Sequence, residues 1–136
     1  MKPVHFPCRV YYEDTDAAGI VYYAAYLKFI ERARTELLRS LGHDHVDLMR
    51  QNIAFAVRSL QIDYLRPAKL DDLLTVESRI DSLGRAQLVF FQSIFRDKER
   101  LLDATIRIAC IDPSRGKAIA MPATIHRQFQ SLLAET

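Results

Sequence analysis

The chain of 136 residues is long enough for one hydrophobic core and too short for two, so we expect a single domain over residues 1–136. Its composition, 49% hydrophobic and 26% charged, is that of an average globular protein and excludes disordered and fibrous classes. Lys and Arg number 19 against 17 for Asp and Glu. Because this cationic excess is small, the sequence predicts no nucleic-acid partner.

The cysteines and the N-terminal residues bear on the cellular compartment. Cys8 and Cys110 are too few for the disulfide framework of a small secreted domain. Residues 1–10 lack the apolar core of a signal peptide, and no apolar run reaches the roughly 18 residues of a membrane span. We therefore expect a cytoplasmic protein without stable membrane insertion.

The first half of the chain predicts a strand followed by a long helix. Residues 4–12 mix β-branched and aromatic side chains and end at a polar turn, which is typical of a strand. Over residues 22–41, apolar side chains recur at spacings of three and four with charges between them, which predicts one amphipathic helix. A short second helix is expected over residues 45–51.

The second half predicts a sheet. Runs rich in Val, Ile, Leu, Phe and Thr cover residues 54–64, 73–80, 86–96 and 101–111, with turn-like residues between them. The simplest arrangement is an antiparallel meander, followed by a terminal helix over residues 122–133. One long helix and about five strands make an α+β fold with the helix covering one sheet face. An open edge strand favours pairing between subunits, so a homo-oligomer is expected.

The segment between the first strand and the long helix carries the chemistry. It places Glu13, Asp14 and Asp16 just before Gly19 and the helix. A helix N-terminus presents free N–H groups and a positive dipole end, which suit a developing oxyanion. Thioester hydrolysis needs such donors together with a carboxylate that attacks or activates water. Asp16 is placed to supply the carboxylate, and Gly19 lets the backbone approach a ligand closely.

The residues around this segment allow other interpretations. Tyr22, Tyr23 and Tyr26 are placed to wall an acyl pocket. However, aspartates before a helix are also ordinary N-caps, and residue types alone do not separate a cap from a catalyst. Capping and catalysis therefore both stay open at this point.

A metal site is a further alternative that the spacing disfavours. A calcium loop starting at Glu13 needs glycine at its sixth position and an acid at its twelfth, where the chain has Ala18 and Ala24. The histidines lack the spacing of zinc ligands. We expect no metal and no other cofactor.

Several motifs together resemble one known family. Residues 11–26 read Y-Y-E-D-T-D-A-A-G-I-V-Y-Y-A-A-Y, and residues 31–36 read E-R-A-R-T-E. Further along come F-A-V-R at 55–58, Y-L-R-P-A-K-L-D-D at 64–72 and C-I-D-P at 110–113. These runs resemble the YbgC-like acyl-CoA thioesterases of the 4-hydroxybenzoyl-CoA thioesterase group. The resemblance implies a hot-dog fold, in which a five-stranded antiparallel sheet wraps a long central helix, and a homotetramer built as a dimer of dimers.

The resemblance also implies a reaction and roles for individual residues. It implies hydrolysis of short- to medium-chain or aromatic acyl-CoA, with Asp16 as the catalytic carboxylate and the Tyr23 N–H in the oxyanion hole. Many members have His at the position of Tyr23. A backbone N–H survives this difference, so the difference bears on the acyl preference rather than on the oxyanion hole. Because CoA carries phosphates, Arg58, Arg85 and the loop with Arg115 and Lys117 are candidates to bind it. The resemblance places Arg85 in a turn that holds the nucleotide phosphate, and each of these arginines is also compatible with an ordinary solvated surface charge.

Two other functions are alternatives to hydrolysis. The pocket of a binding module would hold an acyl chain on CoA or acyl carrier protein with little turnover, in a role linked to envelope phospholipid metabolism. A hot-dog dehydratase usually needs a catalytic histidine near the helix, and this chain has none between His5 and His43. The dehydratase is therefore disfavoured.

Overall fold

A computed structural model describes residues 1–135. The helical elements are the 3-10 turn η1 (Tyr12–Asp14) and the α-helices α1 (Ala25–Ser40), α2 (His45–Arg50) and α3 (Ala123–Ala134). The strands are β1 (Val4–Arg9), β2 (Ala54–Tyr64), β3 (Leu73–Leu83), β4 (Gln87–Arg96), β5 (Glu99–Asp112) and β6 (Lys117–Ala118). The predicted elements are therefore all present, with the two-residue strand β6 in addition.

The strands form one antiparallel sheet in the order β1-β3-β4-β5-β2, and the short β6 pairs with β5. β3, β4 and β5 follow one another as the expected meander. The expectation that β2 precedes β3 in that meander is wrong, because β2 pairs with β5, from Ala54 opposite Ile111 to Tyr64 opposite Leu102. Hydrophobic alternation identifies the faces of a strand but not its neighbours, so the pattern could not give this order.

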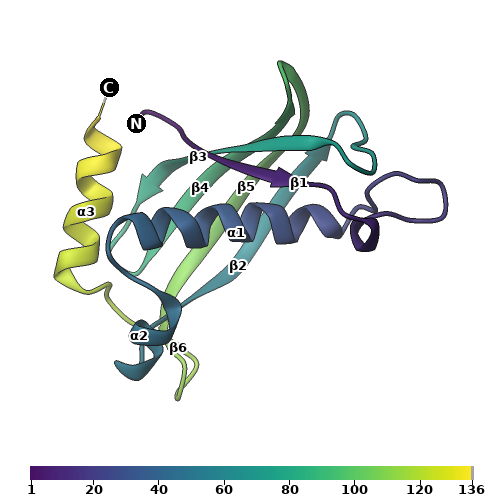
Figure 1. Ribbon diagram of the computed structural model, residues 1–136. Helices are drawn as coiled ribbons and strands as arrows, with labels where there is room; N and C mark the ends of the chain where they lie inside the picture. Colours follow the sequence, from purple (N-terminus) through teal and green to yellow (C-terminus); the bar gives the residue numbers. More distant parts are fainter. Residues whose placement is uncertain (136) are drawn as a thin grey trace.

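The long helix α1 lies across one face of the sheet, and α3 stands beside one end of it (Figure 1). The inward side of α1 and the facing side of the sheet share one buried core. Its main members are Tyr26, Phe29, Ile30, Ala33 and Leu37 from α1 and Leu74, Val76, Phe90, Ile94 and Ile106 from the sheet. Because each large buried side chain contributes roughly 1.5–3 kcal/mol, helix and sheet stabilise each other. This arrangement confirms the predicted α+β hot-dog fold.

The link between β1 and α1 differs in detail from the prediction. β1 ends at Arg9 rather than at residue 12, and α1 begins at Ala25 rather than at residue 22. Between them η1 forms, where the carboxylate of Asp14 accepts the Tyr11 N–H at 2.9 Å. The Tyr22 N–H donates to the Asp14 carbonyl oxygen at 3.3 Å. The residues before the helix are thus closed into a loop.

The cysteines take no part in this loop's chemistry. Cys8 is half-buried and Cys110 is buried, and both are free thiols. Burial raises the pKa of the Cys8 thiol to about 11 and also raises the pKa of Cys110. Both thiols are therefore poor nucleophiles at neutral pH.

Among residues 1–135, no helix has the length and apolar character needed to cross a membrane.

Candidate active site

The turn that holds Glu13, Asp14 and Asp16 contains one buried carboxylate. It belongs to Asp14, a residue that is 3% exposed. It accepts hydrogen bonds from the Tyr11 N–H and from Lys28 Nζ, the latter at 2.8 Å. Burial on its own would raise the pKa of Asp14, but these hydrogen bonds outweigh it and hold that pKa below the ordinary 3.8. Asp14 is therefore an ionised anchor for the loop rather than a group open to substrate.

Asp16, two residues later, is exposed and is the start of a tight turn. Its Oδ1 accepts the Ala18 N–H at 2.8 Å, and its backbone carbonyl accepts the Gly19 N–H at 3.0 Å. Gly19 has a φ of 79°, a left-handed conformation that glycine adopts without strain. This turn holds one carboxylate oxygen in place, and the other has no protein partner among residues 1–135.

A pocket of about 460 Å³ opens beside this turn, and we call it the Asp16 pocket. Its lining comprises Asp16, Ile20, Val21, Tyr22, Tyr23, Tyr26, Tyr64, Leu65, Arg66 and Pro67. The structure thus brings together Asp16 and the tyrosines expected from the sequence, with Gly19 in the turn behind them. Sequence reasoning did not assign Tyr64 to the site. Its signal was the run Y-L-R-P at 64–67, which stood out only as part of the family resemblance.

Tyr23 is fixed from the opposite wall of the pocket. The Tyr64 hydroxyl donates to the Tyr23 carbonyl oxygen at 2.9 Å. The rings of Tyr64 and Tyr26 lie 5.7 Å apart, and the Tyr26 hydroxyl accepts the Ala68 N–H at 3.0 Å. Within residues 1–135 the Tyr23 N–H donates to no protein acceptor. Tyr23, with a free backbone N–H, and Asp16, with a free carboxylate oxygen, therefore line the same pocket.

Burial also affects the two tyrosines of this wall. It raises the pKa of Tyr26 and the pKa of Tyr64 above the ordinary value of 10.0. Both hydroxyls are therefore protonated at neutral pH and act as hydrogen-bonding groups. No histidine lines the pocket, and residues 1–135 contain no cluster of three or more His, Cys, Asp and Glu side chains placed to hold a metal ion.

Arg58 and Arg85 lie together in a separate pocket of about 300 Å³, which we call the arginine pocket. Its other lining residues are Gly84, Ala86, Gln87, Ala109 and Ala118. Strand pairing brings these residues together, because Ala109 of β5 lies between Ala56 of β2 and Gln87 of β4. Arg58 sits at the irregularity in β2 between Val57 and Ser59.

The arginine pocket shares no residue with the Asp16 pocket. The structure therefore groups the predicted site residues into two sets within one chain. The buried Gln87 Oε1 has no hydrogen-bond partner among residues 1–135. In the adjoining loop, Arg115 pairs with Asp112 at 3.9 Å, and neither Arg115 nor Lys117 lines the arginine pocket.

A match to a family model decides the classification. The model of the thioesterase superfamily matches residues 18–102, from the turn beside Asp16 through α1 and into β5. The chain belongs to the thioesterase superfamily. The matched segment includes Tyr23, Tyr64 and both arginines of the second pocket.

Individual thioesterases are similar to this one over most of its length. "Acyl-CoA thioesterase YbgC" of Haemophilus influenzae is 47% identical over 128 residues, which cover 93% of this chain and 94% of the relative. "Acyl-CoA thioester hydrolase YbgC" of Escherichia coli is 44% identical over 126 residues, which cover 92% of this chain and 94% of that one. The solved structure of a probable thioesterase from Bartonella henselae has a TM-score of 0.81 and 38% identity, covering 90% of this chain and 100% of that one. The resemblance to YbgC-like thioesterases is thereby confirmed.

Proposed function

We propose that this thioesterase hydrolyses acyl-CoA to the free acid and CoA in the Asp16 pocket. The observation that carries the proposal is that one pocket is lined by Asp16, which has a free carboxylate oxygen, and by Tyr23, which has a free backbone N–H. The relatives named as acyl-CoA thioesterases and acyl-CoA thioester hydrolases support the same activity.

In the proposed reaction the Tyr23 N–H donates to the thioester oxygen as negative charge builds on it. In one route Asp16 takes a proton from water while the water oxygen attacks the carbonyl carbon. The C–S bond then breaks, and the proton passes to the thiolate of CoA. In the other route the carboxylate itself attacks and expels the thiolate, and water hydrolyses the resulting anhydride. Rapid-quench mass spectrometry separates the routes, because only the second adds the acyl mass to Asp16.

Substitution of Asp16 tests the proposal. We expect Asp16→Asn and Asp16→Ala to lower CoA release by about 100-fold or more without loss of fold, since each removes the base or nucleophile. Glu13→Gln is the matched control, because Glu13 is an exposed carboxylate of the same turn that does not line the pocket. Full activity in either Asp16 variant would refute this assignment.

The proposed acyl groups are short- to medium-chain or aromatic, since the pocket beside Asp16 is lined mainly by aromatic and aliphatic side chains. Thiol release across a panel of acyl-CoA esters tests this preference. The same panel presented on acyl carrier protein shows which carrier the enzyme uses. Saturable binding without thiol release would instead indicate an acyl-CoA or acyl-carrier-protein binding module with a role in envelope phospholipid metabolism.

We further propose that Arg58 and Arg85 bind the phosphates of CoA. Guanidinium groups pair with phosphates through charge-assisted hydrogen bonds, and these two line one exposed pocket.

We propose a cytoplasmic homotetramer, a dimer of dimers, as the working form. The support is β2, an edge strand whose side chains Val57 and Leu60 are 47% and 43% exposed and line a groove of about 470 Å³ against α1. A second copy pairing antiparallel along this edge would cover both side chains. It would also bring the Tyr64 end of one β2 toward the Ala54 end of the other, the half of the strand that carries Arg58, and so the Asp16 pocket of one subunit toward the arginine pocket of the other. Sedimentation of wild type and Leu60→Asp tests this, with a smaller species expected for the variant.

A further inference from the structure

A connection between β2 and β3 lies directly against the turn that carries Asp16. We call residues 65–72 the strap. The Val21 N–H donates to the Ala68 carbonyl oxygen at 2.9 Å, and Ile20 forms a β-bridge with Lys69. The Leu70 N–H reaches the Gly19 carbonyl oxygen at 3.5 Å. The turn is therefore held in place by the strap, through contacts between residues 19–21 and residues 68–70.

The strap is attached to the rest of the fold at both ends by backbone hydrogen bonds. At its start, the N–H groups of Leu65 and Arg66 both donate to the Leu101 carbonyl oxygen. At its end, the Val10 N–H donates to the Asp72 carbonyl oxygen at 2.9 Å and the Asp71 N–H donates back to Val10 at 3.0 Å. The middle of the strap is held by its backbone bonds to the turn, by the Tyr26 hydroxyl, which accepts the Ala68 N–H, and by one arginine.

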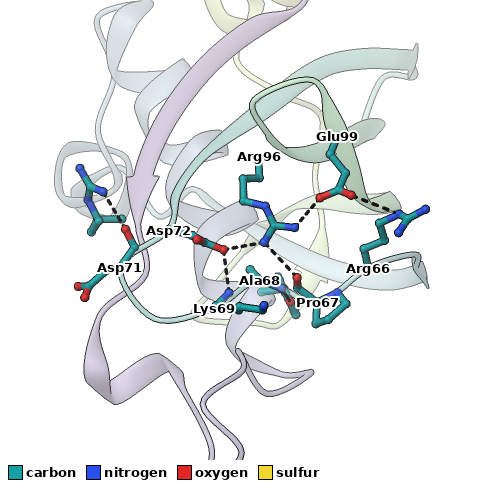
Figure 2. A network of polar contacts seen from close by, with 10 residues as sticks. Arg66, Pro67, Ala68, Lys69, Asp71, Asp72, Arg96 and Glu99 are labelled. Atoms are coloured by element: carbon teal, nitrogen blue, oxygen red, sulfur yellow. Dashed lines mark hydrogen bonds and ion pairs between the residues drawn. The ribbon is translucent and has the colours of Figure 1, made fainter.

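Arg96 of β4 provides that support from outside the pocket (Figure 2). Its guanidinium donates to Asp72 Oδ2 at 2.7 Å, to the Pro67 carbonyl oxygen at 3.3 Å and to Glu99 Oε1. Asp72 Oδ2 also accepts the Lys69 N–H at 2.9 Å. One planar guanidinium thus joins the two halves of the strap.

The surroundings make this network stronger than a surface ion pair. The side chains of Arg96 and Asp72 are only 28% and 22% exposed, so water screens their attraction less than it does for a surface pair. Glu99 in turn pairs with Arg66 at 3.4 Å, so Arg96, Glu99 and Arg66 are connected in series (Figure 2). Arg66 lines the Asp16 pocket. Burial alone would raise the pKa of Asp72, but the Lys69 N–H and Arg96 outweigh it and keep the carboxyl ionised at neutral pH.

We propose that Arg96 is a positioning residue for this thioesterase, fixing the strap and through it the turn that carries Asp16. The inference rests on the proposed acyl-CoA hydrolysis for its catalytic consequence, but not for its structural part. A misplacement of about 1 Å in a catalytic group can cost on the order of 100-fold in rate. Arg96 does not line the Asp16 pocket, so its loss is expected to act on the rate of the chemical step rather than on binding.

The test compares Arg96→Ala with Arg100→Ala. Arg100 is a matched control, since it belongs to the neighbouring strand and pairs with Asp103 and Ser93, and within residues 1–135 it forms no hydrogen bond or ion pair with the strap or the turn. For Arg96→Ala we expect kcat to fall about 10- to 100-fold with KM for acyl-CoA within about twofold. Millimolar methylguanidinium, which can occupy the vacated space, is expected to restore part of kcat. Arg100→Ala is expected to keep both constants near wild type.

Hydrogen exchange makes the test independent of activity. Arg96→Ala is expected to speed exchange of the Val21 and Lys69 amides, while Arg100→Ala leaves them protected as in wild type. Unchanged exchange at both amides in folded Arg96→Ala would overturn the proposal, as would an equal fall of kcat in the control. If wild type releases no thiol, the acyl-CoA hydrolysis is wrong while the exchange result still decides the role of Arg96. Arg96→Lys carries the same test if Arg96→Ala does not fold, since lysine lacks the planar fork.

Discussion

The Tyr64 hydroxyl donates a hydrogen bond to the carbonyl oxygen of Tyr23 at 2.9 Å, although 41 residues separate them in the chain. Tyr64 is the last residue of β2, and Tyr23 stands just before the first turn of α1. This contact fixes the backbone at the residue whose free N–H is the proposed oxyanion donor. The edge strand of the sheet therefore helps to set the geometry in front of the helix.

Tyr64→Phe removes this hydrogen bond and keeps the ring that packs at 5.7 Å from Tyr26. We expect kcat to fall about fivefold, corresponding to the roughly 1 kcal/mol of one net hydrogen bond. Tyr12→Phe is the control, because Tyr12 is 83% exposed and its hydroxyl makes no hydrogen bond within residues 1–135. Steady-state kinetics check the prediction, and equal rates for wild type and Tyr64→Phe would contradict it.

The turn at Gly19 gives a prediction that separates stability from catalysis. Gly19→Ala puts a Cβ on a residue with a φ of 79°, where the added atom has open space but the backbone is strained. We expect a loss of about 1–2 kcal/mol in the free energy of unfolding, together with lower kcat as Asp16 shifts. Gly116→Ala is the matched control, since Gly116 has a φ of 68° in an exposed turn away from the Asp16 pocket.

Urea unfolding and steady-state kinetics distinguish the two glycines. Both variants are expected to unfold at lower urea concentration, and only Gly19→Ala is expected to lose activity. A Gly116→Ala enzyme that loses as much activity as Gly19→Ala would show that the effect is general destabilisation.

The ion pair of Asp14 with Lys28 predicts how stability depends on pH. The pKa of Asp14 is lowered in the folded state, so its contribution is complete above the ordinary pKa of 3.8 and is lost as pH falls through the lower folded value. Asp14→Asn is expected to cost about 1–3 kcal/mol at neutral pH, since a buried charge-assisted hydrogen bond is lost. The difference from wild type is expected to shrink below about pH 4.

Thermal unfolding from neutral to acid pH measures this difference. Lys28→Met should reproduce part of it, because the Lys28 ammonium is the nearest charge that lowers the pKa of Asp14. A gap between wild type and Asp14→Asn that widens toward acid would contradict the assignment of Asp14 as an ionised anchor.

The sequence was most informative where function depends on neighbours in the chain. Asp16, Gly19 and the tyrosines at 22, 23 and 26 fall within one short segment, so any compact loop before the helix keeps them close. What the residue types did not reveal was which carboxylate is open to substrate. Asp14 and Asp16 differ in burial, and burial depends on how Lys28 of α1 packs back over the turn.

The parts that the sequence did not predict depend on the sheet order. Tyr64 and the strap reach the site only because β2 lies at the edge beside β5 and the chain must then return to β3. A meander with β2 beside β3 would have sent the same residues into an ordinary hairpin turn. Arg96 lies at the end of β4 beside the start of β3, a pairing that the meander did predict, but its contact with Pro67 depends on the path of the strap.

The arginine pocket gives a prediction that separates nucleotide binding from chemistry. Arg58→Gln and Arg85→Gln each remove a guanidinium from a pocket that lies apart from Asp16. We expect KM for acyl-CoA to rise about fivefold or more in each, the effect of roughly 1 kcal/mol for a partly screened phosphate contact, with kcat near wild type. An acyl-N-acetylcysteamine thioester carries no nucleotide, so its KM is expected to stay unchanged.

Arg127→Gln is the control, because Arg127 of α3 is exposed and lies outside both pockets. A rise in KM for both substrates alike would instead mean that the arginines support the fold, because a phosphate contact cannot affect a substrate without phosphate.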